Sequence, residues 1–110
     1  MSLINEIEVV ELAKLKEAGE NVRVIDIRQP AELTSGIIPG AEALPMHTIP
    51  VRMNELNREE KLIMVCRSGA RSAQACMFLQ QQGYDKVYNL RGGMMAWAGS
   101  GLEIGLPQAV

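Results

Sequence analysis

The sequence predicts a single α/β domain with a mostly parallel sheet. Segments that have the residue pattern of strands alternate along the chain with segments of helical periodicity. The run Leu62–Val65 is short, uncharged and apolar, as expected of a central strand that is covered on both faces. A length of 110 residues suits one hydrophobic core and leaves no room for a second.

The first half of the chain is expected to form a helix, a strand and a long connection. A helix is predicted where apolar residues recur at helical spacing: Val9, Leu12, Ala13 and Leu15. Gly19 is placed to end that helix, and the β-branched segment Val22–Ile27 predicts a strand. Prolines and glycines over Gln29–Pro45 predict an irregular connection, interrupted by a short strand near Ala43-Leu44.

The second half repeats the alternation around the strand at 62–65. Thr48 is predicted to cap a short helix that has a proline in its first turn. A helix is predicted over Ala70–Gln82, a strand over Lys86–Leu90, and a final helix from Gly92-Gly93 through Trp97. The last residues, Gly101–Val110, are expected to form a loosely packed tail.

Composition excludes several classes of partner. The net charge is −2 with no block of like charge, which argues against nucleic-acid and anionic-membrane partners. Only four aromatic side chains are present, too few for a stacking platform for single strands. Met1–Val10 lacks the long apolar run of a secretory signal, and no stretch approaches the roughly 20 apolar residues of a membrane span. We therefore expect a cytoplasmic protein whose two cysteines stay reduced.

The junction after the central strand carries the chemistry. Cys66 stands at the carboxyl end of that strand, where open α/β sheets bind their ligands. The loop runs through Cys66, Arg67, Ser68, Gly69, Ala70, Arg71 and Ser72. Gly69 allows a tight turn that aims backbone N–H groups at one point, next to the positive end of the following helix. The two arginines add positive charge, and the two serines add hydroxyl donors.

These features favour a thiolate, so Cys66 is predicted to be substantially ionised at neutral pH. The loop size then narrows the chemistry. Cysteine-dependent phosphatases use a Cys-x5-Arg loop, usually with a histidine before the cysteine. Here four residues separate Cys66 from Arg71, and Val65 precedes the cysteine. The smaller ring should crowd a phosphate but could hold one extra anionic sulfur atom on Cys66.

This loop resembles the active-site loop of the rhodanese family, the thiosulfate sulfurtransferases. Three further segments resemble family motifs in the same order: Asp26-Ile27-Arg28 with Glu32, then Gly36–Ala41, then Asn89–Gly93 with Trp97. The resemblance implies one rhodanese-like domain over 1–110, with a matched core at about 5–102 and a tail at 103–110. It implies three layers, with a five-stranded, mostly parallel sheet between helices.

The resemblance also implies a two-step reaction without a metal or organic cofactor. Cys66 would take the outer sulfur of a donor such as thiosulfate, hold it as a persulfide, and pass it to cyanide or a thiol. The loop from Arg67 to Ser72 would bind the substrate, with either Arg67 or Arg71 on the donor anion. The polar residues Asp26, Arg28 and Glu32 would brace the pocket. Ile37 stands where the family commonly has histidine, which puts one local polar contact in doubt.

Two other functions stay open at this point. One is a non-catalytic rhodanese-like module that binds a partner or senses redox state through Cys66. The other is a phosphatase or arsenate reductase that uses the same cysteine. Cys76 is interpreted as a core residue and His47 as a surface residue, so no metal cluster can be assembled. The sequence leaves the physiological donor, the acceptor, the pathway and the oligomeric state undetermined.

Overall fold

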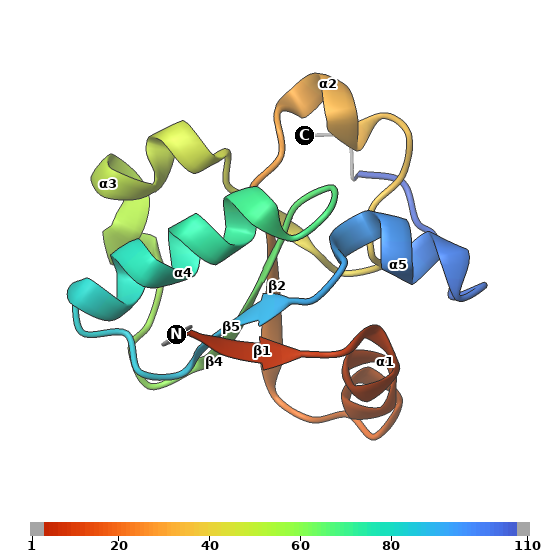
Figure 1. The fold of residues 1–110 in the computed structure, drawn as a ribbon, viewed down its shortest axis with the longest axis horizontal. Helices are drawn as coiled ribbons and strands as arrows, with labels where there is room; N and C mark the ends of the chain where they lie inside the picture. The colour runs from red at the N-terminus through yellow and green to blue at the C-terminus, as the bar shows by residue number, and fades with distance from the viewer. Residues whose placement is uncertain (1–3, 108–110) are drawn as a thin grey trace.

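A computed structural model, which describes residues 4–107, contains a five-stranded sheet (Figure 1). The strands are β1 (Asn5–Ile7), β2 (Val22–Asp26), β3 (Glu42–Ala43), β4 (Lys61–Val65) and β5 (Val87–Leu90). Their order in the sheet is β1-β5-β4-β2-β3, and every pairing of neighbours is parallel. The predicted α/β class with a mostly parallel sheet is therefore confirmed.

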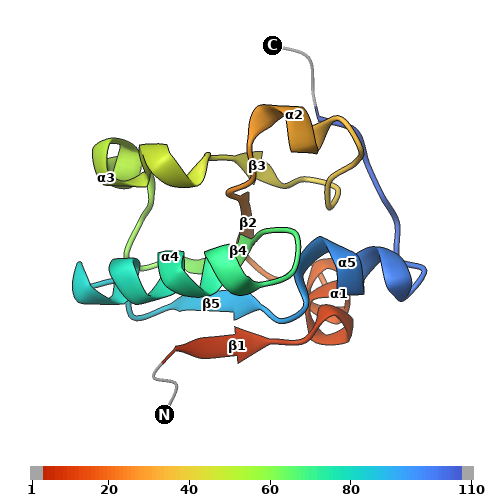
Figure 2. The ribbon, with the colours of Figure 1, turned by 45° about the horizontal axis from the view of Figure 1, so that its top comes forward.

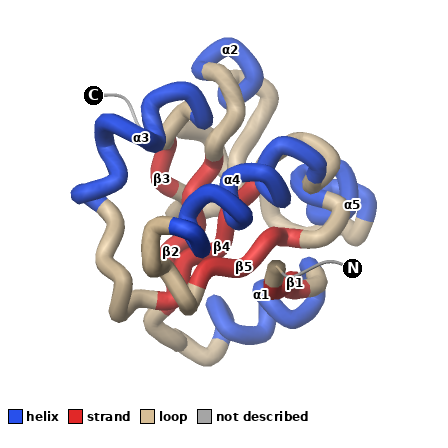
Figure 3. Tube along the Cα trace, turned by 60° about the vertical axis from the view of Figure 1, so that its left-hand side comes forward, coloured by secondary structure: helices blue, strands red, loops and turns tan. Residues whose placement is uncertain are grey.

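Helices cover both faces of the sheet (Figures 2 and 3). The α-helices of the structure are α1 (Val9–Glu17), α2 (Pro30–Leu33), α3 (Ile49–Arg52), α4 (Ala70–Gln81) and α5 (Gly93–Gly99), and all but α2 contribute residues to the two buried clusters beside the sheet. Residues of α3 and α4 belong to one buried cluster, and residues of α1 and α5 belong to the other. The sheet is thus the middle of three layers. No helix among the described residues is long and apolar enough to span a membrane.

The central strand β4 supplies both cores. Leu62 and Met64 pack in the cluster with α3 and α4, while Ile63 and Val65 pack in the cluster with α1 and α5. Successive side chains of a strand point to opposite faces, so an uncharged run is what a strand covered on both faces requires. The carboxyl end of β4 lies beside that of β2, because Val65 pairs with Asp26.

One strand and one α-helix of the structure are not predicted by the sequence pattern. The edge strand β1 has only three residues, and two of them are exposed, so it carries almost no apolar pattern. The short helix α2 lies inside the connection expected to be irregular. A reciprocal capping box forms it, in which the Glu32 side chain accepts from the Gln29 N–H at 3.0 Å. Polar capping thus organises a segment that lacks hydrophobic periodicity.

The predicted cap at Thr48 is wrong in its detail. Thr48 precedes α3, but its side chain makes no capping bond to that helix. Its hydroxyl instead donates to the Pro45 carbonyl at 2.6 Å, and Thr48 itself closes a 3-10 turn over Met46–Thr48. A second 3-10 turn follows at Met53–Glu55, so the segment is a chain of short turns around α3.

The described part of the expected tail is anchored rather than loosely packed. Gly105 and Ile37 form an antiparallel bridge with two backbone hydrogen bonds of 2.8 and 2.9 Å. The Trp97 Nε1–H group donates to the Glu103 carbonyl at 2.7 Å. Ile37, at the position where the family commonly has histidine, is buried and is fixed through its backbone. Residues 108–110 of the expected tail lie outside the described residues.

Candidate active site

The loop after β4 folds around the sulfur of Cys66. The Gly69 N–H donates to Cys66 Sγ at 3.1 Å, and the Ser72 N–H donates to it at 3.3 Å. Gly69 lies immediately before α4 with a φ of 101°. That left-handed conformation suits glycine, and it turns the chain so that the first N–H groups of the helix face the sulfur. The predicted convergence of backbone donors on Cys66 is present.

This environment sets the ionisation of Cys66. Burial raises the pKa of the thiol, but the backbone N–H groups of Ser72, Gly69 and Ser68 lower it, and the Ser72 hydroxyl lowers it further whenever it turns to donate to the sulfur. The lowering contributions prevail, so the pKa lies below the ordinary value of a cysteine. The positive end of the α4 dipole acts in the same direction. Cys66 is a buried thiol whose surroundings favour its anion.

A buried polar network continues beyond the sulfur. Ser72 Oγ lies 3.3 Å from Cys66 Sγ, and the Ser72 hydroxyl donates to Asn89 Oδ1. Asn89 Nδ2 donates in turn to the Gly69 carbonyl at 3.2 Å and to Glu6 Oε2 at 3.1 Å. From the sequence, Asn89 is marked only as part of a family motif. The signal that could have marked it is a polar residue on a strand that is otherwise mostly apolar.

Backbone contacts fix the loop to α5. The Met94 N–H donates to the Cys66 carbonyl at 2.9 Å, and the Met95 N–H donates to the Arg67 carbonyl at 3.0 Å. Gly93, with a φ of 56°, permits this approach, because a Cβ at that position would meet both carbonyl oxygens, that of Arg67 at 2.7 Å. The pair Gly92-Gly93 therefore serves close backbone packing against the loop.

The two loop arginines have different surroundings. Arg71 forms a bidentate ion pair with Glu32 of α2, with both N–O distances at 2.9 Å. Hydrogen bonds from Arg71 lower the pKa of Glu32 to about 2, helped by the Gln29 N–H. Arg67 is exposed and lines a hollow with Met94 and Met95; within residues 4–107 it makes no ion pair. Spacing alone could not reveal that Arg71 meets a carboxylate 39 positions away.

Asp26 and Arg28 form a buried pair next to the loop. Arg28 Nη2 lies 2.8 Å from Asp26 Oδ2, and both side chains are almost fully enclosed. Arg28 also donates to the Gly36 carbonyl at 2.8 Å and to the Glu32 carbonyl at 3.3 Å. These bonds tie the end of β2 to α2 and to the connection after it. Structurally, the pair holds in place the helix that presents Glu32 to Arg71.

The remaining candidates lie away from this arrangement. Cys76 is fully buried within α4, and burial raises the pKa of its thiol to about 12. His47 is exposed in the turn before α3. In the part of the chain that the structure describes, no group of three or more histidine, cysteine, aspartate or glutamate side chains could hold a metal ion. Cys66 is therefore the side chain that combines a nucleophile with an activating environment.

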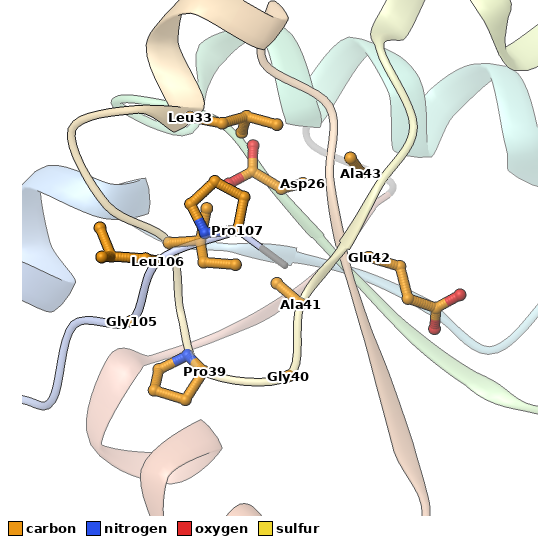
Figure 4. A pocket seen from close by; sticks show the side chains of 11 residues that line it. Asp26, Leu33, Pro39, Gly40, Ala41, Glu42, Ala43, Gly105, Leu106 and Pro107 are labelled. Carbon is orange, nitrogen blue, oxygen red and sulfur yellow. The ribbon is translucent and has the colours of Figure 1, made fainter. Parts of the chain in front are cut away.

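A separate hollow lies between the connection after α2 and the C-terminal segment (Figure 4). Its lining is mainly apolar, with Leu33, Pro39 and Pro107 among the side chains that face it. The Asp26 carboxylate at its edge is already held by Arg28. Cys66 and the rest of the loop 66–72 do not line it. The hollow has no cysteine, and its second carboxylate, that of Glu42, is paired with Arg23, so the candidate site stays at the loop.

Comparisons with known proteins show similarity over most of the chain. The family model of the rhodanese-like domain matches residues 8–100. The chain is 50% identical to a sulfurtransferase of Allochromatium vinosum, covering 96% of this chain and 99% of that protein. It is 40% identical to the thiosulfate sulfurtransferase GlpE of Pseudoalteromonas translucida, over 71% of this chain and 74% of that protein. A rhodanese-like domain protein of Staphylococcus aureus superposes with a TM-score of 0.85 at 34% identity, over 96% of this chain and 100% of that chain.

Proposed function

The chain belongs to the rhodanese family, and we propose that it is a sulfurtransferase that carries a sulfane sulfur on Cys66 as a persulfide. One observation carries the proposal: the Gly69 and Ser72 N–H groups converge on Cys66 Sγ. Such donors stabilise an anionic sulfur before the reaction, and they are placed to stabilise a second sulfur bonded to the first.

The proposed reaction has two steps. The Cys66 thiolate attacks the outer sulfur of a donor such as thiosulfate, the S–S bond of the donor breaks, and sulfite leaves with the electron pair. The negative charge then resides on the outer sulfur of the Cys66 persulfide. An acceptor thiolate or cyanide attacks that outer sulfur and regenerates the Cys66 thiolate. This is covalent catalysis, and it predicts ping-pong kinetics.

The charges around the loop assign roles to the arginines. Arg71 is largely neutralised by Glu32, whereas Arg67 is exposed and makes no ion pair among residues 4–107. Arg67 is therefore our choice for binding the anionic end of a donor. Arg71 would orient the start of α4 through Glu32, and the buried pair Asp26–Arg28 would brace α2 from below.

The names of the relatives support a sulfurtransferase and suggest the first donor to test. One relative is named sulfurtransferase, and another is named thiosulfate sulfurtransferase. Both cysteines are free thiols, so we also propose that the protein works in a reducing compartment, with the cytoplasm as the first choice. A persulfide carrier needs its thiol reduced between turnovers.

The test is to incubate the protein with thiosulfate and to measure its intact mass. We expect a gain of one sulfur atom that is removed by cyanide and absent in Cys66→Ala. A parallel incubation with glutathione persulfide shows whether a protein that thiosulfate does not load uses a different donor or transfers no sulfur at all. If neither donor loads Cys66, the chain is a non-catalytic module. If Cys66 supports turnover of a small phosphate ester that is lost in Cys66→Ser, the phosphatase alternative is correct.

A further inference from the structure

Asn89 is a buried polar side chain that contacts the loop at two places. It lies on β5 and is 2% exposed. Its Nδ2 group donates to the Gly69 carbonyl and to the Glu6 carboxylate. Both partners can only accept hydrogen bonds, so they fix which end of the amide faces them. The amide oxygen of Asn89 therefore faces Ser72.

Ser72 has only one hydroxyl proton to give. The Asn89 amide oxygen can only accept, so the proton between the two side chains comes from Ser72. The Ser72 oxygen then presents a lone pair to Cys66 Sγ, 3.3 Å away. Ser72 is fully buried, so its hydroxyl has no contact with bulk solvent.

The acceptor that the Ser72 hydroxyl proton should be donated to differs between the thiol and the thiolate of Cys66. A neutral thiol can donate its own S–H to Ser72 Oγ, and every member of the network is then satisfied. A thiolate has no proton to donate, so it gains from Ser72 only if the hydroxyl turns toward the sulfur. That turn leaves the buried Asn89 oxygen without its donor, which opposes the change.

We propose that Asn89 is a positioning residue that competes with Cys66 for the single hydroxyl proton of Ser72, so that ionisation of Cys66 is coupled to a turn of that hydroxyl. The effect on sulfur transfer rests on the proposed function. In a Cys66 persulfide the charge lies on the outer sulfur, and the Ser72 hydroxyl returns to Asn89. The hydrogen bond from Ser72 to Asn89 thus favours the Cys66 persulfide, with its charge on the outer sulfur, over the thiolate, with its charge on Sγ.

Titration of the thiolate by its ultraviolet absorbance tests the coupling without any sulfur donor. The Cys76 thiol, whose pKa burial raises to about 12, ionises outside the relevant range. In Asn89→Leu the Ser72 hydroxyl is released to the sulfur. We expect the thiolate fraction at a pH below the midpoint to rise about fivefold, the worth of one hydrogen bond. Added to Ser72→Ala, the same substitution should give no rise.

A matched control removes charge but keeps the network. Glu6→Gln still offers an acceptor oxygen to Asn89 Nδ2, so we expect its midpoint to stay near that of the wild type. Three results would overturn the proposal: an unchanged or higher midpoint in Asn89→Leu, an equal rise in the Ser72→Ala background, or a downward shift in Glu6→Gln as large as that in Asn89→Leu.

The wild-type protein gives a second test that does not depend on the folding of any variant. The side-chain carbonyl carbon of Asn89, followed by NMR, should shift with pH at the midpoint of the Cys66 thiolate. A resonance that does not move through that titration contradicts the coupling. Because neither titration uses a sulfur donor, failed loading by thiosulfate and by glutathione persulfide would remove the proposed function and leave the coupling standing. If the protein is loaded with sulfur but the titrations show no coupling, the proposed function stands and the coupling is wrong.

Discussion

The two cysteines show how position within an element controls a buried thiol. Cys66 and Cys76 belong to the same buried cluster, and each is at most 1% exposed. The pKa of Cys66 lies below its ordinary value, whereas burial raises that of Cys76 to about 12. The first N–H groups of a helix have no partner within it, but N–H groups in its interior are already bonded. Burial opposes both thiolates, and the unpaired N–H donors at the start of α4 compensate only at Cys66.

The difference between the two cysteines should be largest in the rate of sulfur loading. Cys66→Ala should lower loading by at least about a thousandfold, because the nucleophile is gone. Cys76→Ala should leave the loading rate close to that of the wild type. Intact mass after incubation with the donor measures both. Loading that persists in Cys66→Ala, or disappears in a folded Cys76→Ala protein, would reverse the roles of the two thiols.

Backbone packing behind the loop should have the next largest effect. A Cβ at Gly93 would meet the carbonyl oxygens of Cys66 and Arg67, so Gly93→Ala must displace the loop. Displacement of about 1 Å at a reacting centre can cost about 100-fold in rate, which is the loss we expect for loading.

Gly19→Ala is the matched control for that substitution. Gly19 has a similar φ of 73°, but its Cβ would meet nothing within 4 Å. In both variants a left-handed alanine should lower the free energy of unfolding by about 1 kcal/mol, and the collision with the loop should lower it further in Gly93→Ala; urea unfolding measures both losses. Only Gly93→Ala should also lose loading, and equal loading rates in the two variants would show that contact with α5 does not position the sulfur.

Charge at the loop is expected to have a smaller, salt-dependent effect. Arg71→Ala removes a positive charge and leaves the Glu32 carboxylate unpaired, so loading by an anionic donor should fall about fivefold at low salt. Glu32→Gln removes the negative charge beside Arg71 and should raise the loading rate. Arg58→Ala is the control, because Arg58 binds the Gln82 carbonyl at the opposite end of α4. A loading rate that is unchanged in Arg71→Ala at low salt would show that the charge of Arg71 does not assist binding of the anionic donor.

The two cysteines should also differ in how much a serine in their place lowers the free energy of unfolding. Cys76→Ser places a hydroxyl among apolar side chains and should lower the free energy of unfolding by about 1 to 3 kcal/mol. Cys66→Ser should cost less, because the Gly69 and Ser72 N–H groups can donate to the new hydroxyl. Urea unfolding of both variants provides the comparison. A greater loss in Cys66→Ser would mean that the loop donors do not serve an oxygen at that position.

Much of the fold could be read from the sequence because β4 and its neighbours carry strong local patterns. The uncharged run before Cys66 indicates a central strand, and Gly69 indicates the turn after it. The edge strand β1 escaped prediction because a strand with one buried residue has no hydrophobic period. The anchored segment at Gly105 depends on a bridge to Ile37, a contact across 68 positions that local pattern cannot show.

The candidate site was predicted in its residues but less well in its contacts. Cys66 at the strand end and the donors after it follow from local chemistry. The arginines and serines looked alike in the sequence, yet Arg71 is paired with Glu32 and the Ser72 hydroxyl is given to Asn89. Such assignments depend on which side chains the sheet order brings together. They could be stated only once β5 and α2 had been placed beside the loop.

The pH dependence of alkylation at the two cysteines of one native protein tests the central claim most directly. A thiol with a lowered pKa keeps its anion as pH falls and loses it only below the range of an ordinary cysteine. We predict that Cys66 is alkylated with a midpoint below that of a free cysteine, while Cys76 stays unmodified until the protein unfolds. A midpoint for Cys66 at or above the free-cysteine value, or faster modification of Cys76, would contradict the account.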